Sequence, residues 1–208
     1  VFSTLTSRYI TSPESVMDLD IRRISEKGFL EYFKEMEESN LSDTFWEIGL
    51  VQDLETSAIN SPFFNVFLAA QVHGSDNSLL MNGTKVRDLI TTMGDIHHIF
   101  PKVYLQKNGI TDKSKYNQIA NYTYLDTQTN ISIGEKAPND YFKTVFEQCN
   151  SKQMKFGNIS ETALLIENLK TNCIPENIVF MDASHYEDFL LERRKLMAKK
   201  IKDYYYSL

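Results

Sequence analysis

Cysteine is scarce in this sequence of 208 residues, and glycine-rich phosphate loops are missing. Neither of its two cysteines, Cys149 and Cys173, has a cysteine or histidine partner at the spacing of a zinc site. Two unclustered cysteines favour a reducing cytosol over a disulfide scaffold, so we expect a cytoplasmic protein. Because no Gly-rich loop of the Walker type is present, the chain should not hydrolyse nucleotides by itself.

Long apolar runs are also missing. No stretch approaches the roughly 20 apolar residues that cross a bilayer, and no secretory signal opens the chain, so we expect no membrane partner. Apolar residues make up 42% and charged residues 24% of the sequence, which is typical of a globular protein with its own core. The chain opens with Val1, and residues 2–5 read like the interior of a longer sequence, so we expect a C-terminal fragment of a longer protein.

The net charge is −6, which counts against a nucleic-acid partner because phosphate binding needs lysine and arginine. The charge is uneven, however. Residues 14–55 carry twelve acidic and four basic side chains, whereas residues 192–202 carry six basic and one acidic. Local charge near a site matters more than the total, so DNA stays open as a partner.

Helical spacing of apolar residues covers most of the chain. Ser12-Pro13 and Ser61-Pro62 each pair an N-cap residue with a proline at the first helical position, and Gly28 should interrupt the first helix. We further expect Ser160 as an N-cap and a capping box over Ser184–Glu187. The other predicted helical segments are 63–70, 84–90, 101–108, a helix from 127, 138–148, 160–172 and a helix from 184. Trp46 and the phenylalanines at 63–67 are interpreted as core.

Two short segments in the middle, Asp95–His98 and Asn121–Leu125, are predicted strands. With the helix expected after them, they form a ββα unit. The predicted fold is therefore mainly α with a small ββα-metal hairpin-plus-helix insert. We expect a single domain over residues 1–208, with helices over 1–92, the ββα core over 93–142 and C-terminal helices over 143–208.

The chemistry-bearing residues lie in this middle region. Adjacent residues of a strand point to opposite faces, so His97 and His98 can take different roles, one binding metal and one facing water. A strand turn and a helix start would bring Asn130 back beside His97. Phosphodiester cleavage needs such a set, because a metal must neutralise the phosphate and an oriented base must activate water. Taken singly, Asn117, Asn121 and Asn130 could each be ordinary turn residues.

His97-His98-Ile99-Phe100-Pro101 resembles the opening motif of HNH, or ββα-metal, nucleases. Asn121 and Asn130 resemble the second and third motif positions of that family. The closer resemblance is to the C-terminal nuclease domain of GmrSD-type modification-dependent restriction enzymes, and it extends to residues 116–121 and 130–138. It is strong over 94–142 and diffuse elsewhere.

The resemblance implies a role for each residue. His98 would be the general base that activates water, and Asn121 would hydrogen-bond within the loop and steady His98. His97 and Asn130 would bind a divalent metal. Asp95 would add a ligand or accept a hydrogen bond from one.

One departure concerns the metal. Many HNH sites have aspartate where His97 stands. Magnesium prefers oxygen ligands, whereas imidazole also suits manganese, nickel or zinc. We expect Mg²⁺, with Mn²⁺, Ni²⁺ and Zn²⁺ as alternatives. The candidate nucleic-acid contacts are Lys102, Lys136, Arg193 and Arg194.

The function that the resemblance implies is a DNA endonuclease that hydrolyses phosphodiester bonds, in restriction-modification or phage defence against modified or foreign DNA. A nucleotide-hydrolysing domain N-terminal to the nuclease would be its partner. The alternative is a non-catalytic helical module, for protein interaction or DNA binding, in which the histidines are structural. A gel shift without cleavage would favour that alternative.

Overall fold

The structure is a computed structural model that describes residues 1–92 and 94–208; the side chain of Asp95 lies outside the described part. It is mainly helical with a small two-stranded antiparallel sheet, as predicted. The α-helices are α1 (Phe2–Leu5), α2 (Pro13–Lys27), α3 (Phe29–Asn40), α4 (Leu50–Asp53), α5 (Pro62–His73), α6 (Val86–Thr91), α7 (Lys102–Lys107), α8 (Lys113–Tyr116), α9 (Thr127–Ile133), α10 (Pro138–Ser151), α11 (Thr162–Thr171) and α12 (Tyr186–Tyr205). The strands are β1 (Asp95–His98) and β2 (Tyr122–Leu125). A π-helical turn spans Phe45–Gly49, and 3₁₀ turns span Ile119–Asn121, Ile178–Phe180 and Ala183–His185.

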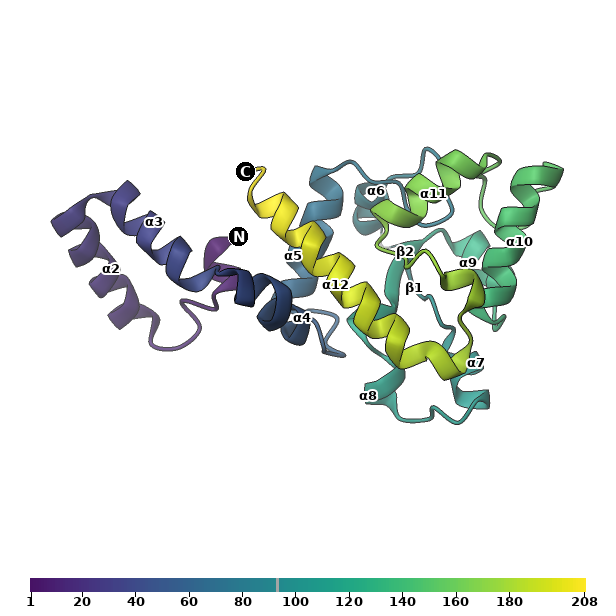
Figure 1. The fold of residues 1–208 in the computed structure, drawn as a ribbon, viewed down its shortest axis with the longest axis horizontal. Helices are drawn as coiled ribbons and strands as arrows, with labels where there is room; N and C mark the ends of the chain where they lie inside the picture. The colour runs from purple at the N-terminus through teal and green to yellow at the C-terminus, as the bar shows by residue number, and fades with distance from the viewer. Residues whose placement is uncertain (93) are drawn as a thin grey trace.

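Helices α2 and α3 form an arm, residues 13–40, that projects from the rest of the molecule (Figure 1). Gly28 joins them with a φ of 88°, a left-handed conformation that glycine adopts without a steric penalty. The predicted interruption at Gly28 is therefore confirmed. In the body, α12 runs diagonally across the molecule and packs on α4 and α5 (Figure 1).

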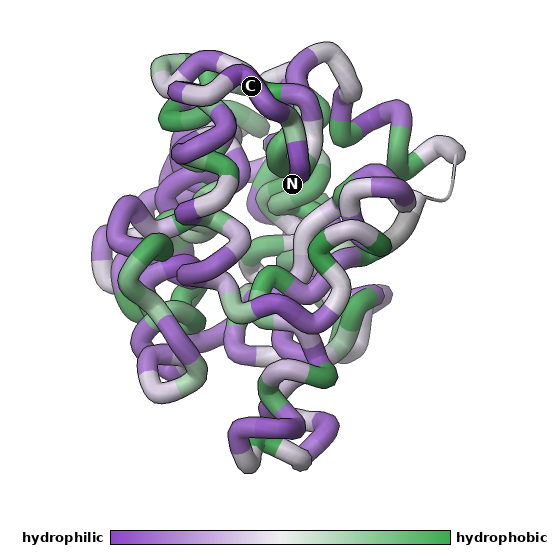
Figure 2. Tube along the Cα trace, turned by 90° about the vertical axis from the view of Figure 1, so that its right-hand side faces the viewer, coloured by the Kyte–Doolittle hydropathy of each residue, from purple (hydrophilic) through white to green (hydrophobic). Residues whose placement is uncertain are grey.

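Buried apolar side chains of the described residues form a cluster that extends from Leu5 to Tyr205. Trp46, Phe64 and Phe67 belong to it, which confirms their interpretation as core. Helix α5 is apolar nearly all round and lies inside this cluster. Hydrophobic and hydrophilic residues alternate along the helices rather than forming separate segments (Figure 2), as amphipathic helices around a shared core require.

Two predicted helix starts are wrong. Helix α11 has Glu161 rather than Ser160 at its N-cap, with no side-chain cap. At α12 the capping box lies at Asp182–His185 instead of Ser184–Glu187, because the chain enters the helix through a 3₁₀ turn. Within that turn the Asp182 carboxylate already accepts from the Ser184 N–H at 2.9 Å.

Strands β1 and β2 pair antiparallel, and α9 follows β2 after one residue. That residue, Asp126, caps α9 by accepting the Thr129 N–H at 3.1 Å. Helix α9 packs against β1, so the predicted ββα arrangement is observed. The second strand starts one residue later than predicted, because Asn121 ends a 3₁₀ turn instead.

Candidate functional site

The two histidines stand at the end of β1, where the sheet register pairs His97 with Thr123 and His98 with Tyr122. Alternation along the strand turns their side chains to different surroundings. His97 is buried, with 3% of its surface exposed, whereas His98 is half-buried. The two imidazoles therefore lie in different surroundings, as strand alternation predicts.

His97 faces helix α9. Its Nδ1 lies 2.7 Å from Oδ1 of Asn130, so the hairpin and the helix bring together two residues that are far apart in the sequence. Burial lowers the pKa of His97 to about 4, although the hydrogen bond to Asn130 acts in the opposite direction. The ring is therefore neutral at pH 7, the form in which imidazole binds metals.

His98 faces a different asparagine. Its Nε2 lies 2.9 Å from Oδ1 of Asn117, and the ring of Tyr122 packs edge-on against it with centroids 4.9 Å apart. Burial lowers the pKa of His98, the hydrogen bond to Asn117 raises it, and the charge of Lys102 lowers it further. His98 is therefore also held neutral, and its position is fixed from two sides.

Asn121 is fully buried and holds the loop after β1. Its Oδ1 accepts the Phe100 N–H at 2.8 Å, and its Nδ2 donates to the carbonyls of Phe100 and Tyr116 at 3.1 and 3.2 Å. The predicted hydrogen bonding within the loop is confirmed. The side chain in contact with His98 is Asn117, so Asn121 acts on the backbone around His98 instead.

Sequence reasoning missed Asn117 because a lone asparagine after a short helix reads as turn chemistry. It does lie at the end of α8, four residues before Asn121. Its position inside the segment that resembles the nuclease family, residues 116–121, was the signal that could have found it.

His97 Nδ1 and Asn130 Oδ1 are joined by a hydrogen bond of 2.7 Å, so the ring nitrogen carries the proton in this arrangement. Both atoms could bind one divalent cation only after that proton left and the two atoms separated to about 3 Å, the spacing of neighbouring ligands around Mg²⁺. Among the described residues no group of three His, Cys, Asp or Glu side chains gathers to hold a metal. The side chain of Asp95, a predicted ligand, lies outside the described part of the chain. The described ligand pair is uncharged, so an anionic phosphate would have to complete the coordination.

Arg193 is not a nucleic-acid contact. Its side chain is fully buried, and Nη1 donates to the carbonyls of Ala120 and Tyr122 at 2.9 and 2.7 Å. Those carbonyls stand on either side of Asn121, so Arg193 holds the start of β2 from inside the core. Its neighbour Arg194 is largely covered and pairs with Glu55 at 3.2 Å.

The two candidate lysines are exposed. Lys102 lies over the ring of Tyr116 at 5.4 Å and is close enough to His98 to influence its pKa. Lys136 donates from Nζ to the carbonyls of Ser132 and Ile133 at the end of α9.

In the segment between the strands, sequence reasoning named Lys102 and missed three further lysines. Residues 102–115 include four lysines and one aspartate, and all five side chains are exposed. They belong to α7 and α8 or adjoin them, on the connection between the two strands. Of these lysines, Lys102 is close enough to His98 to lower its pKa, and Lys107 is paired with Glu135 at 2.7 Å.

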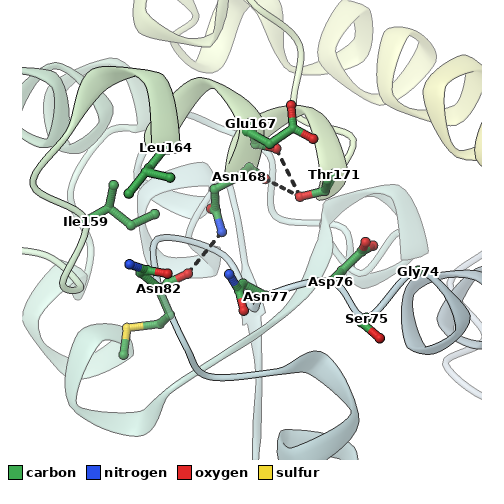
Figure 3. A pocket seen from close by; sticks show the side chains of 11 residues that line it. Gly74, Ser75, Asp76, Asn77, Asn82, Ile159, Leu164, Glu167, Asn168 and Thr171 are labelled. Carbon is green, nitrogen blue, oxygen red and sulfur yellow. Dashed lines mark hydrogen bonds between the residues drawn. The ribbon is translucent and has the colours of Figure 1, made fainter.

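A cavity of about 160 Å³ lies elsewhere, between the loop at 74–82 and α11, and both polar and apolar side chains line it (Figure 3). Asn168 lines it, but its carboxamide is occupied in holding the loop, by accepting from Leu80 N and donating to the Ser78 and Met81 carbonyls. None of the lining residues belongs to β1, β2 or α9, so the cavity is separate from the histidine pair.

No family model, curated protein or solved structure matches this chain. None of the described helices combines the length and apolar content needed to cross a membrane.

Proposed function

We propose that this chain is a metal-dependent endonuclease that hydrolyses phosphodiester bonds in DNA. The observation that carries the proposal is the approach of His97 Nδ1 to Asn130 Oδ1 at 2.7 Å, with His98 as the next residue. The contact joins β1 to α9 and brings two possible metal ligands close to a separately held imidazole, which supports the proposal. Each of the two histidines thus has its own carboxamide partner.

In this proposal His97 and Asn130 hold a divalent cation, with Mg²⁺ expected and Mn²⁺, Ni²⁺ or Zn²⁺ as alternatives. The bound cation supplies positive charge for the phosphate and the departing 3′ oxygen. His98 takes a proton from water, and the water oxygen attacks phosphorus as the bond to the 3′ oxygen breaks. Asn121 fixes the loop on which His98 depends.

The phosphate backbone would be met by the exposed lysines of residues 102–115 and by Lys136. Of these lysines Lys102 is near His98, and local positive charge of this kind can attract phosphate although the net charge of the chain is negative. The buried Arg193 takes no part in this contact.

The biological setting proposed here follows from the family resemblance of residues 94–142. It is the restriction of modified or foreign DNA, with a nucleotide-hydrolysing domain as partner. The proposed chemistry of the site does not depend on that domain.

The test is cleavage of supercoiled plasmid by the purified chain with Mg²⁺ or Mn²⁺. Loss of a general base costs about 10²- to 10⁴-fold in rate, so His98→Ala should nearly abolish nicking, and chelator should abolish it. His97→Ala and Asn130→Ala should raise the metal concentration needed. The matched control is His73→Ala, since His73 is an exposed histidine in α5.

Nicking that survives His98→Ala would refute the assigned base. Absence of cleavage together with a salt-sensitive gel shift in chelator would instead identify a DNA-binding module with structural histidines.

A further inference from the structure

We propose that Asn117 is the positioning residue of His98: its carboxamide oxygen accepts the Nε2 proton and leaves the lone pair on Nδ1 to act as the base. The catalytic consequence of this contact, though not the contact itself, rests on the proposed function. The assignment names the reacting atom of His98 and gives a role to Asn117.

The first support is geometric. Asn117 Oδ1 lies 2.9 Å from His98 Nε2, which is the usual distance of an N–H···O hydrogen bond. Asn117 is itself held at the end of α8, where its backbone N–H donates to the Lys113 carbonyl at 3.0 Å. The partner of His98 thus stands on a fixed backbone position.

The second support is an aromatic contact to the ring of His98. Tyr122, directly opposite His98 in the sheet register, packs against the imidazole at an interplanar angle of 87°. The hydrogen bond and this aromatic contact together restrict rotation about the side-chain bonds of His98. A base held in this way needs little further ordering when a substrate binds.

The tautomer follows from the chemistry of the acceptor. A carboxamide oxygen has no proton to give, so a hydrogen bond to it requires that Nε2 carries the proton. In a neutral imidazole the other nitrogen then has the free lone pair. Within the described part of the chain, the hydrogen bond of the His98 ring is the one from Nε2 to Asn117.

A carboxamide also suits a site that receives phosphate. Aspartate in the place of Asn117 would accept the same proton, but its negative charge would stabilise the imidazolium and repel DNA. Asparagine orients the ring without adding charge. The three asparagines thus have different contacts: Asn117 orients His98, Asn121 holds the loop, and Asn130 faces His97.

The direct experiment is ¹⁵N NMR of the imidazole nitrogens in the metal-free full chain at pH 8, with the His98 signals assigned by their loss in His98→Gln. The wild type should show His98 with the proton on Nε2. In Asn117→Ala the signals should move to an average of both tautomers. Asn117→Asp, which keeps the acceptor oxygen, should restore the Nε2–H tautomer.

The kinetic experiment uses plasmid nicking by the same variants. Loss of an orienting partner costs about 10- to 100-fold in activity, so Asn117→Ala should lower kcat in that range with little change in KM. Asn117→Asp should restore part of kcat while raising KM, because its charge opposes phosphate binding. The matched control is Asn177→Ala, since Asn177 is an exposed asparagine outside the site.

A wild-type His98 with its proton on Nδ1 would overturn the proposal. So would an Asn117→Ala variant that keeps both the Nε2–H tautomer and the wild-type kcat. If Asn117→Ala does not fold, the NMR spectra of the wild type and Asn117→Asp still decide the tautomer. If neither the wild type nor any variant cleaves DNA, the proposed function fails, while the NMR result still tests the contact.

Discussion

The arm at residues 13–40 and the ββα unit at residues 94–133 differ in how many of their side chains are buried. In the arm, Asp20 is the buried residue of α2, and α3 has none among the described side chains. Apolar residues such as Ile21 and Leu30 stay exposed there, at 66% and 81%. In the ββα unit, by contrast, Phe100, Leu125 and Ile133 are fully buried.

Polar contacts hold the base of the arm. Both Arg8 Nε and Tyr9 OH donate to Oδ2 of Asp20, at 2.9 and 2.8 Å, and Tyr32 OH donates to Oδ1 at 2.7 Å. Arg8 also pairs with Oδ1 of Asp20, and this guanidinium holds the pKa of the carboxyl well below its usual range. Two further contacts join the arm to the rest of the chain: Tyr205 OH donates to Glu37 at 2.6 Å, and the rings of Phe2 and Phe33 lie 5.2 Å apart.

The side chains of the candidate site are held in place more firmly than those of the arm. A catalytic constellation must be held to within about 0.5 Å, and the histidine pair is followed directly by the fully buried Ile99 and Phe100. The arm has few buried contacts and should open locally without disturbing the site.

The largest effect should come from removing Arg193. Its side chain is fully buried and satisfies the Ala120 and Tyr122 carbonyls, and burial lowers its pKa to about 10, so it is charged at pH 7. Arg193→Met should lower the free energy of unfolding by about 3–5 kcal/mol, because buried carbonyls lose their donors. Urea denaturation measures this loss. Arg194→Met is the control and should have a far smaller effect; equal effects would contradict the role given to Arg193.

The second-largest effect should be a fall in the free energy of unfolding of the metal-free protein at acid pH. His97 has a folded pKa of about 4, below its ordinary value of 6.5. As pH falls, His97 therefore takes up a proton in the unfolded chain before it does so in the folded protein. The free energy of unfolding that this difference contributes is fully present above pH 6.5 and is lost as pH falls towards 4. Integration over that window gives about 3 kcal/mol.

Urea denaturation at pH 7, 6, 5 and 4.5 tests this dependence against His97→Gln. The variant should show a flatter decline over the same range, although its stability at pH 7 can differ. Parallel curves for the two proteins would show that His97 is not the titrating group.

The smallest effect should be confined to the arm. Asp20→Asn weakens the charge-assisted hydrogen bonds to Arg8, so the free energy of local opening of α2 and α3 should fall by about 2 kcal/mol. Hydrogen exchange should accelerate in α2 and α3 and stay unchanged in α9. Lys27→Ala, which removes the exposed pair with Glu35, is the control and should change little. Faster exchange in α9 as well would refute the independence of the two regions.

Much of the architecture was predictable because it depends on local rules. The break at Gly28, the prolines at the starts of α2 and α5 and the buried apolar helix α5 all follow from backbone conformation or periodicity. The capping box of α12 was misplaced because a preceding 3₁₀ turn moved the first free N–H groups towards Asp182.

The sequence by itself determined the ββα order and the pairing of His97 with Asn130, because strand alternation and chain reversal are local consequences of residue pattern. Only the tertiary structure decided that Asn117 contacts His98 and that Arg193 is buried beneath β2. Both depend on how α8 and α12 pack against the hairpin. Side chains can meet across such interfaces at any sequence separation, so the spacing of residues along the chain does not predict these contacts.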